Sequence, residues 1–367
     1  MQIHSLCTEA LGSGPWSPLI PLPEELAPSQ ADLVIVGAGV TGLSAALSLA
    51  GCDISIVVVD RHVGGGATSR SGGIILGDTL TGPSQEFDGC ELTLGHWIEQ
   101  HGIQCDFTWA RCLELAHDAE LPLEPIDWFD HGIVRAAGVV TSAVIDPVLL
   151  LNNLLTEVRC LGIPVVSGFE VEAVSRKGDT PVIIERTTRI AARSVIMATD
   201  AVAWRCDRDP WTERTLTIAL QTSPAPRGTI PAIGLEPRQP FYTRELPLLW
   251  GRAMRDGSLL FGRELTAFPW NAPPALIAER VAEAGARLAK RVRGLHPRLA
   301  EIDVQRVWAG PTARTALGVP SIVDDENIPH VFWAGGYGGH GLAQAFTLGR
   351  LAAAEVLADL GLTIKSA

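Results

Sequence analysis

The chain has 367 residues, of which 47% are hydrophobic and 19% are charged, and this composition excludes a disordered protein or a coiled coil. Its 29 basic and 41 acidic residues give a net charge of -12, which disfavours a protein that binds duplex nucleic acid or attaches to anionic lipid by charge. At ~150 residues per domain, the length predicts about two domains.

Seven cysteines stand at wide spacings without a CxxC pair, which predicts free thiols in a reducing, cytoplasmic compartment. We expect no metal site, because His96, His101 and His117 lack the spacing of ligands. Residues 1–30 are rich in proline and lack the pattern of a signal peptide, so we expect an arm on the surface. Glycines and polar residues interrupt the apolar stretch 31–59, which favours strand, helix and strand over a transmembrane span.

The segment from residue 33 to residue 60 has the pattern of a dinucleotide-binding unit. Leu33–Val36 predicts a buried strand, Leu43–Ala50 a helix, and Ile54–Val59 a second strand that ends at Asp60. The first connection reads GAGVTG, whose glycines allow a tight turn and a close approach to a pyrophosphate, while Asp60 can accept hydrogen bonds from ribose. A glycine-rich turn without a ligand is the alternative. The expected cofactor contacts here are Gly37, Gly39, Val40, Thr41, Gly42, Asp60 and Arg61.

A glycine-rich loop from Val63 to Gly73 follows the second strand. It can run close to an extended cofactor, with Ser69 and Arg70 as donors to a pyrophosphate or a flavin. A flexible surface loop is the alternative. The expected cofactor contacts in this loop are Ala67, Thr68, Ser69, Arg70, Gly72 and Gly73.

Helix and strand patterns alternate in the middle of the chain. Residues 146–161 predict a helix, and Ile163–Val166, Val182–Arg189 and Ser194–Met197 predict strands. The last of these strands ends in Ala198-Thr199, and such an end lies near the ligand crevice of a doubly wound sheet. A plain strand terminus is the alternative.

The last third of the chain predicts two helices and a second glycine-rich loop. The helices are expected over Pro274–Val292 and Leu342–Leu360. Between them, residues 335–341 contain five glycines, which let the backbone lie against a flat ring system. The following helix would then direct its N-terminus at a reduced flavin. A loop that only covers the sheet is the alternative.

This order of segments resembles the D-amino-acid-oxidase-like FAD-dependent oxidoreductases, and it is most similar to the γ-glutamylputrescine oxidoreductase branch, with glycine and sarcosine oxidases as cousins. The resemblance extends from about residue 16 to the C-terminus. The residues that carry it are Gly37, Gly39, Gly42 and Asp60; Gly66–Arg70 with Gly72 and Gly73; Ala198–Asp200; Leu259–Gly262; Trp308, Gly310, Thr315 and Pro320; and Gly336–Gly341.

The resemblance implies an α/β fold with a Rossmann-like FAD-binding domain built from discontinuous segments, and an α+β substrate domain with an antiparallel sheet. We assign residues 1–80, 141–205 and 305–367 to the FAD-binding domain, and residues 81–140 and 206–304 to the substrate domain. The isoalloxazine would lie between them. The FAD contacts expected beyond the first two loops are Val171, Ala198, Thr199, Gly310, Gly336, Tyr337, Gly338, Gly339, His340 and Gly341.

The activity implied by the resemblance is oxidation of the C–N bond of an amine or amino-acid-like substrate. Hydride transfer to flavin N5 gives an imine, and O2 or another acceptor reoxidises the flavin. His340, Tyr337 and Arg252 are the candidate catalytic side chains. The alternatives are a dehydrogenase subunit that passes electrons to a partner, a catalytically poor flavoprotein with an interaction role, and an NAD(P)-dependent dehydrogenase; the oligomeric state stays open.

Four departures from the family pattern refine this expectation. No cysteine follows Cys206, and Ala309 stands near the position that tethers the flavin in sarcosine-oxidase-like members, so we expect non-covalent FAD. Gly310 stands near the arginine that holds the substrate carboxylate in amino-acid oxidases, which favours an amine. The segment between Leu115 and Ile145 is shorter than in typical relatives, and Asp200 stands where relatives often carry Asn.

Overall fold

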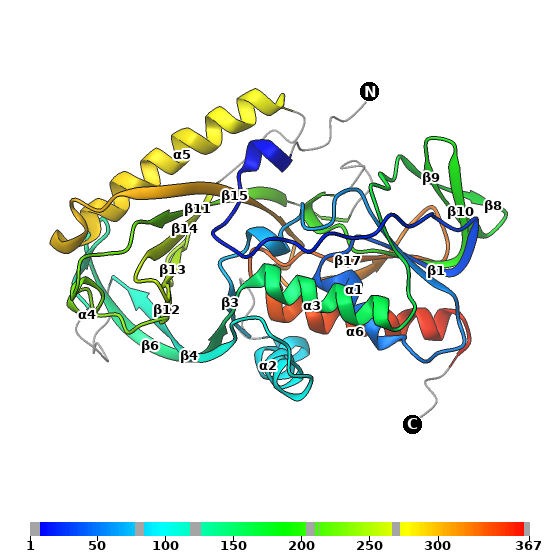
Figure 1. Cartoon of the computed structure of the whole chain (residues 1–367), viewed down its shortest axis with the longest axis horizontal. Helices are drawn as coiled ribbons and strands as arrows, with labels where there is room; N and C mark the ends of the chain where they lie inside the picture. The colour runs from blue at the N-terminus through cyan, green and yellow to red at the C-terminus, as the bar shows by residue number, and fades with distance from the viewer. Residues whose placement is uncertain are drawn as a thin grey trace.

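A computed structural model describes residues 8–77, 84–117, 126–202, 210–211, 213–265 and 272–362. Cys7, Cys206, residues 118–125 of the shortened segment and the predicted boundaries after residues 80 and 205 lie outside these ranges. Two β-sheets lie side by side in the described part, and each has its own helices (Figure 1).

The first sheet has five parallel strands in the order β17-β10-β1-β2-β7. These strands are β1 (Gln30–Val36), β2 (Ile56–Asp60), β7 (Val165–Ser167), β10 (Thr188–Met197) and β17 (Val331–Gly335). Three antiparallel strands are added to it: β16 (Ser321–Asp324) at the edge beside β17, and β9 (Thr180–Glu185), which pairs with the start of β10 and with β8 (Ala173–Lys177). The central β1 is apolar and buried on both faces, as in parallel sheets that are covered on both sides.

Four helices form the layer on one face of this sheet (Figure 1). They are α1 (Val40–Ser48), α2 (Cys90–Gln100), α3 (Pro147–Cys160) and α6 (Gly341–Asp359). Helices α1 and α6 cross closely at Gly349, where an added Cβ would overlap the carbonyl oxygen of Thr41 and lie 2.9 Å from Cβ of Ser44. The hydroxyl of Ser44 donates to the carbonyl of Phe346 at 2.6 Å.

The second sheet has the order β15-β11-β14-β13-β12-β4-β6-β3, and its pairs are antiparallel except β12 with β4. Its strands are β3 (Ile74–Ile75), β4 (Thr108–Ala116), β6 (Ile133–Val144), β11 (Glu213–Thr222), β12 (Pro240–Thr243), β13 (Leu249–Ala253), β14 (Leu259–Leu265) and β15 (Val304–Arg314), with β5 (Trp128–Phe129) paired to β6. The strands β6 and β15 belong to this sheet along their whole length, so the sheet extends past the predicted domain boundaries at residues 140 and 305.

Alternation along the strands divides the two faces of the second sheet. On β11, Leu216, Ile218 and Leu220 pack on one face with α5 (Pro274–Leu295) and its buried residues. The short helix α4 (Thr229–Ala232) lies at the far end of this sheet (Figure 1). Thr217, on the opposite face of β11, is directed toward the first sheet and lines a cavity there.

The N-terminal arm follows α3 across the surface (Figure 1). The amide of Ser17 donates to the carboxylate of Asp146 at 2.8 Å, and the amide of Ile20 donates to the side chain of Asn152 at 2.9 Å. Because Asp146 also caps α3, accepting from the amides of Val148 and Leu149, the arm and the helix share one carboxylate.

The predicted elements are confirmed with shifts of a few residues, except in one place. The helix expected over 146–161 is α3, and the two C-terminal helices are α5 and α6. The strand predicted over Val182–Arg189 is wrong, because the chain turns at Arg186, where φ is 47°, and starts β10 at Thr188. The result is a β9–β10 hairpin, and β10 then continues to Met197 as one strand.

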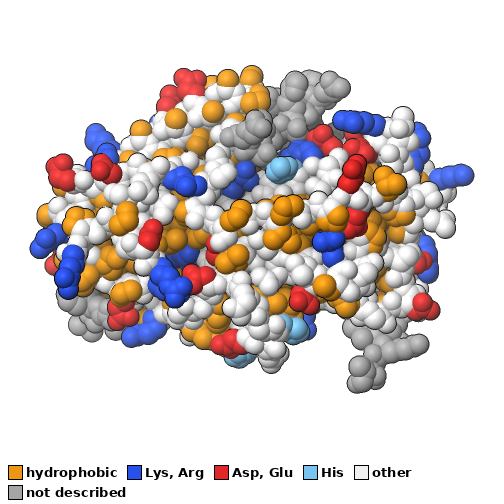
Figure 2. All heavy atoms as spheres, viewed as in Figure 1, with side chains coloured by type: hydrophobic (Ala, Val, Ile, Leu, Met, Phe, Trp, Pro, Cys, Tyr) orange, Lys and Arg blue, Asp and Glu red, His pale blue; other side chains and the backbone are white. Residues whose placement is uncertain are grey.

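Acidic and basic side chains are interspersed on the face shown in Figure 2, with hydrophobic side chains between them. The charges on this face therefore do not form a field of one sign. Within the described ranges, none of the helices combines the length and the apolar character that crossing a membrane requires.

The crossing of α1 and α6 gives a prediction about stability. Gly349→Ala should destabilise the protein by about 1 to 3 kcal/mol, because the added methyl group would push the two helices apart. Urea unfolding followed by circular dichroism measures this change. Gly294→Ala on α5, where an added Cβ meets no atom within 4 Å, is the matched control and should be neutral or stabilising by up to about 1 kcal/mol. Equal effects of the two substitutions would contradict the assigned crossing.

Candidate functional site

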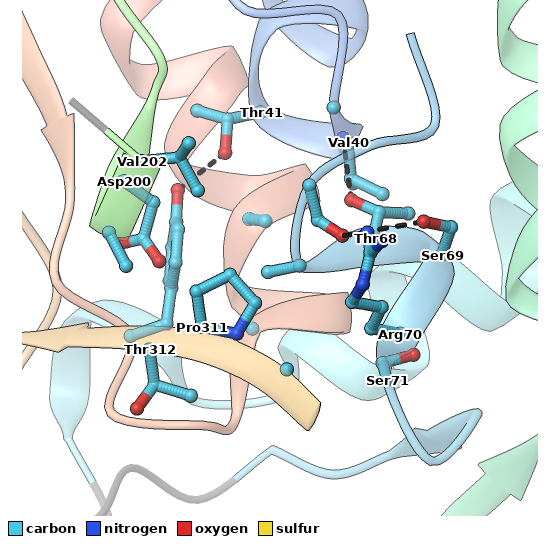
Figure 3. Close-up of a pocket in the computed structure, with 18 of the residues that line it drawn as sticks. Val40, Thr41, Thr68, Ser69, Arg70, Ser71, Asp200, Val202, Pro311 and Thr312 are labelled. Atoms are coloured by element: carbon cyan, nitrogen blue, oxygen red, sulfur yellow. Dashed lines mark hydrogen bonds between the residues drawn. The ribbon is translucent and has the colours of Figure 1, made fainter. Parts of the chain in front are cut away.

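A cavity of about 1110 Å³ lies between the carboxyl ends of β1, β2 and β10 and the inner face of the second sheet. Carboxyl ends of parallel strands are where α/β sheets bind ligands. Figure 3 shows Asp200, Val202 and Thr312 on one side of this cavity and Thr68, Ser69 and Arg70 on the other.

The turn between β1 and α1 opens the N-terminus of α1 to the cavity. Gly37 has a φ of 111°, and a Cβ at this position would lie 2.5 Å from the carbonyl oxygen of Ala198 on β10. Gly39 is the N-cap of α1 and supplies no side chain to cap it. The amide of Val40 donates to the Thr68 hydroxyl at 3.4 Å (Figure 3). Free amides at a helix N-terminus, together with the helix dipole, suit a phosphate.

Asp60 ends β2 and is held in place by the backbone. Its carboxylate oxygens accept from the amides of Ala38 and His62, each at 2.7 Å. Burial raises the pKa of Asp60, and the two amide donors act in the opposite direction. Each oxygen keeps a second lone pair, so the carboxylate can still accept from two hydroxyl groups of a ribose. Arg61 beside it lies 3.5 Å from the carboxylate of Glu170.

The loop from Gly64 to Gly73 forms the next part of the cavity wall. It contains the 3-10 turn Thr68–Arg70, and the Arg70 side chain is 8% exposed. The Arg70 guanidinium donates back to the carbonyls of Gly65 and Gly66, and burial lowers the pKa of Arg70. From the second sheet, the Trp308 indole N–H donates to the carbonyl of Arg70 at 2.9 Å. This loop is therefore shaped by its own arginine and by the other sheet.

The C-terminal glycine loop is held at two points. The carboxylate of Asp200 accepts from the amide of Gly336 at 2.8 Å, and burial raises the pKa of Asp200 to about 6. The hydroxyls of Tyr337 and Thr41 lie 2.6 Å apart in a buried hydrogen bond (Figure 3). Burial also raises the pKa of Tyr337, which keeps its hydroxyl protonated. The loop that precedes α6 is thus fixed both to the segment that follows β10 and to α1.

His340 is the N-cap of α6 and lines the cavity. Burial lowers the pKa of His340 to about 4, so the imidazole is neutral at neutral pH. Its Nδ1 atom and the Thr199 hydroxyl are buried polar atoms with no hydrogen-bond partner in the described part of the chain. Both residues line the cavity, and such groups are normally satisfied by a ligand or by water.

The second sheet contributes an uncharged wall. The side chains of Thr217, Tyr242, Leu248 and Trp250 line the cavity from β11 to β13, and β15 adds Gly310, Pro311 and Thr312. The Tyr242 hydroxyl donates to the carboxylate of Glu114 at 3.0 Å. The Trp250 ring lies so close to Gly72 and Gly262 that a Cβ on either glycine would overlap it.

Most of the cofactor contacts predicted from the sequence line this cavity. They are Gly37, Gly39, Val40, Thr41, Asp60, Arg61, Ala67, Thr68, Ser69, Arg70, Gly72, Val171, Ala198, Thr199, Gly310, Tyr337, Gly338, Gly339, His340 and Gly341. Gly42, Gly73 and Gly336, which were also predicted, are not among the described residues that line the cavity. The expectation for Arg252 requires a correction, because its guanidinium is turned away from the cavity and donates to the carbonyls of Gly73 and Ile145.

Sequence reasoning did not find several wall residues of the second sheet. Thr217, Thr312 and Leu248 are lining residues that it did not single out. One signal was available for Thr217, because it is a polar residue between the apolar Leu216 and Ile218 and therefore marks the opposite face of the strand. The position of Leu248 depends on how β12 and β13 pair, which the sequence does not display.

Comparisons with known proteins agree with this architecture. Residues 32–355 match the family model described as FAD dependent oxidoreductase. The probable oxidoreductase OrdL of Haemophilus influenzae is 24% identical, over 90% of this chain and 83% of its own length. Glycine oxidase from Geobacillus kaustophilus has a TM-score of 0.68 at 17% identity, covering 93% of this chain and 100% of that structure. L-amino acid deaminase from Proteus myxofaciens has a TM-score of 0.67 at 14% identity, covering 94% and 93% of the two chains.

The cavity fits FAD. Its volume of about 1110 Å³ exceeds that of most drug-sized pockets, as an extended dinucleotide requires. The turn at Gly37 lets the backbone approach a pyrophosphate. The unsatisfied Thr199 hydroxyl and His340 Nδ1 give polar partners near the loops that face the second sheet. In the described part, none of the cysteines lines the cavity, and non-covalent attachment stays a prediction.

The buried hydroxyl pair predicts energetic coupling. Tyr337→Phe and Thr41→Val should each destabilise the apoprotein by about 1 to 2 kcal/mol, because each leaves one buried hydroxyl without its partner. The double variant removes both hydroxyls, so no hydroxyl is left without a partner. Its loss of stability should therefore be smaller than the sum of the losses of the two single variants. Urea unfolding of the four proteins gives this difference. Additive losses would show that the two hydroxyls do not interact.

Asp200 predicts a pH-dependent stability. The folded apoprotein holds a proton on Asp200 up to pH of about 6, whereas an unfolded Asp releases it near its model value of 3.8. The wild-type protein should therefore lose stability as the pH rises through this window, and Asp200→Asn should remove the loss. The stability advantage of Asp200→Asn should grow by about 2 kcal/mol between pH 4 and pH 7.

Urea midpoints measured at several pH values test this prediction. Glu170→Gln replaces an exposed carboxylate at the cavity rim and is the matched control. A constant difference between Asp200→Asn and the wild type across this pH range would show that Asp200 does not titrate in the window.

Proposed function

Because this chain belongs to the family of FAD-dependent oxidoreductases, we propose that it oxidises the C–N bond of an amine to an imine. Bound FAD supplies the hydride acceptor for such a reaction. Hydrolysis of the imine would then release a carbonyl compound together with ammonia from a primary amine or an amine from a secondary one, and O2 or another acceptor would take the electrons. The names of the two structural relatives, a glycine oxidase and an L-amino acid deaminase, support chemistry at a C–N bond.

The first sheet and its loops would hold the cofactor. The Asp60 carboxylate can accept from ribose hydroxyls, and the N-terminus of α1 can bind the phosphates. The loop with Arg70 can place cationic and amide donors along an extended ligand. Near Gly338–Gly341, the glycine backbone can lie against a flat ring system and the start of α6 directs its dipole there, with His340 beside it.

The observation that carries the substrate class is the uncharged wall of the second sheet. Among the described residues, the charged side chains that line the cavity come from the segments of the first sheet, and they are Asp60, Arg61, Arg70, Glu170, Glu172 and Asp200. Opposite them, β11, β12, β13 and β15 contribute hydroxyl, aromatic and aliphatic groups among the described residues. A free carboxylate on this side would lose its hydration without gaining a cation.

The Arg252 guanidinium, which could have supplied this cation, already forms hydrogen bonds elsewhere. Arg252 is 4% exposed, and its donors are directed at two backbone carbonyls behind the wall. Gly310, near which the family arginine is expected, offers only backbone. The substrate is therefore an amine whose reacting carbon carries no free carboxylate, with an apolar or aromatic group against Trp250 and Leu248.

The protein offers little acid–base help at this wall. His340 is neutral and can donate or accept one hydrogen bond, which suits orientation of a neutral amine. The Tyr337 hydroxyl is held by Thr41, so we do not assign it a proton transfer. The amine would therefore react in its neutral form, and the residues of the wall would bind it, orient it and exclude water.

Matched substrate pairs test this proposal. Benzylamine should bleach the oxidised-flavin absorbance, under anaerobic conditions, at least about ten times faster than D- or L-phenylglycine at equal concentration, because an unpaired carboxylate costs roughly 1 to 3 kcal/mol or more. Stopped-flow absorbance measures both rates. N-methylbenzylamine extends the pair to secondary amines.

Two other results would contradict different parts of the proposal. Faster bleaching by phenylglycine would reject the carboxylate-free substrate class but keep C–N oxidation. Bleaching by benzyl alcohol or another hydroxy compound, with no response to any amine or amino acid, would reject C–N oxidation itself.

A further inference from the structure

Arg252 stands where four segments of the chain meet. It lies on β13, and its Nη1 donates to the carbonyl of Gly73 at 2.8 Å. Its Nη2 donates to the carbonyl of Ile145, between β6 and α3, at 3.0 Å. The Trp16 ring of the N-terminal arm covers the guanidinium, with 5.1 Å from Cζ to the ring centroid. One side chain thus joins the second sheet, the cofactor loop, the start of α3 and the arm.

In the described part of the chain, Arg252 forms no ion pair, although the carboxylates of Asp106 and Asp146 act on its charge from a distance. The Nε atom of Arg252 lies 3.2 Å from the Met254 sulfur. Burial lowers the pKa of Arg252 to about 9, so the group is still charged at neutral pH. A buried cation whose donors go to backbone carbonyls instead of a paired carboxylate is costly for stability alone, which indicates that its hydrogen-bonding geometry has another use.

The carbonyl that Arg252 holds belongs to a point of the cofactor loop where the backbone requires glycine. Gly73 has a φ of 64°, and an added Cβ there would overlap the carbonyl oxygen of Ile145 and lie 3.3 Å from Nη2 of Arg252. The amide of Ile145 donates to the same Gly73 carbonyl at 2.9 Å. Two donors therefore fix one peptide at the end of the loop, directly after the cavity-lining Gly72.

The second sheet holds this loop at two further positions. The Trp250 ring packs directly on Gly72, and the Trp308 indole donates to the carbonyl of Arg70 at 2.9 Å. Together with Arg252 they contact Arg70, Gly72 and Gly73 of this loop. Residues 67–72 of the loop line the cavity that fits FAD.

We propose that Arg252 is a positioning residue for the cofactor, which acts from the second sheet by fixing the Gly73 peptide and thereby the FAD-binding conformation of residues 67–72. FAD affinity then depends on a side chain that does not line the FAD cavity. This role concerns the cofactor and not the substrate, so it stands or falls separately from the proposed amine oxidation.

Four variants of the full chain test this role. Arg252→Met removes both donors but keeps an apolar side chain of similar length, and Arg252→Lys keeps the charge but reaches one carbonyl instead of two. Trp308→Phe keeps a ring and removes the donor to Arg70. Arg255→Met is the matched control, because Arg255 lies two residues after β13, is 79% exposed and pairs with Asp106 at 3.2 Å.

Two measurements on apoprotein are needed. The first is the Kd for FAD, from quenching of tryptophan fluorescence on titration. The second is the rise in Tm that saturating FAD produces, since a ligand stabilises the folded state according to its affinity. The Tm of each apoprotein reports global stability independently.

The expected result is a Kd at least about tenfold higher for Arg252→Met, a smaller increase for Arg252→Lys, and a Kd within about twofold of wild type for Arg255→Met. The Tm rise on adding FAD should shrink in the same order. Trp308→Phe should weaken FAD binding, and in combination with Arg252→Lys its effect should not be additive, because both side chains hold one loop.

A merely structural role predicts something different. Arg252→Lys would then lower the apoprotein Tm and leave the Kd for FAD within about twofold of wild type, and this outcome would overturn the proposal. If Arg252→Met fails to fold, Arg252→Lys and its combination with Trp308→Phe still decide the question through the Kd.

Discussion

The constraint on which the site depends is the close approach of β1 and β10 at Gly37. The amide of Ala198 donates to the carbonyl of Val36 at 2.8 Å, so the two strands stay paired up to their carboxyl ends. A Cβ at Gly37 would meet the Ala198 carbonyl at 2.5 Å, and only glycine adopts the φ of 111° without cost. This turn aims the N-terminus of α1 into the cavity and brings Thr199 to the same edge of the sheet. The cofactor side of the site therefore follows from one backbone contact between parallel strands.

The second sheet determines the rest of the site in two ways. Its inner face supplies the uncharged wall with Thr217, Trp250 and Thr312. Its side chains also reach across to the loop that follows β2, through the Trp308 indole and the Arg252 guanidinium. The two halves of the chain are consequently not independent modules, because part of the first sheet's ligand cavity takes its shape from the second. These contacts between the sheets are possible because the chain returns to each sheet several times.

The features that the sequence predicted correctly are determined by residues close to one another in the chain. The glycine turn, the acid at the end of β2 and the α6 helix are encoded by neighbouring residues, and the structure places them at one cavity. The direction of Arg252 could not be predicted, because it depends on the register of β12, β13 and β14, which long-range pairing decides. The turn at Arg186 was missed because a non-glycine residue there adopts a positive φ. Thr217 was partly predictable. The alternation of polar and apolar residues on β11 shows that Thr217 lies on the face opposite Leu216 and Ile218, but it does not show that this face lines a cavity.

One physical effect, desolvation, accounts for both the selectivity and the acid–base properties that the proposed reaction needs. Burial lowers the pKa of His340 to about 4 and of Arg252 to about 9, so the region around the cavity disfavours uncompensated positive charge. An alkylammonium bound against the same wall would also lose protons more readily than in water. Only the neutral amine has the lone pair that assists departure of a hydride from the adjacent carbon. The wall that disfavours a free carboxylate would therefore also favour the reactive form of the amine, which explains how such a site can function without a dedicated base.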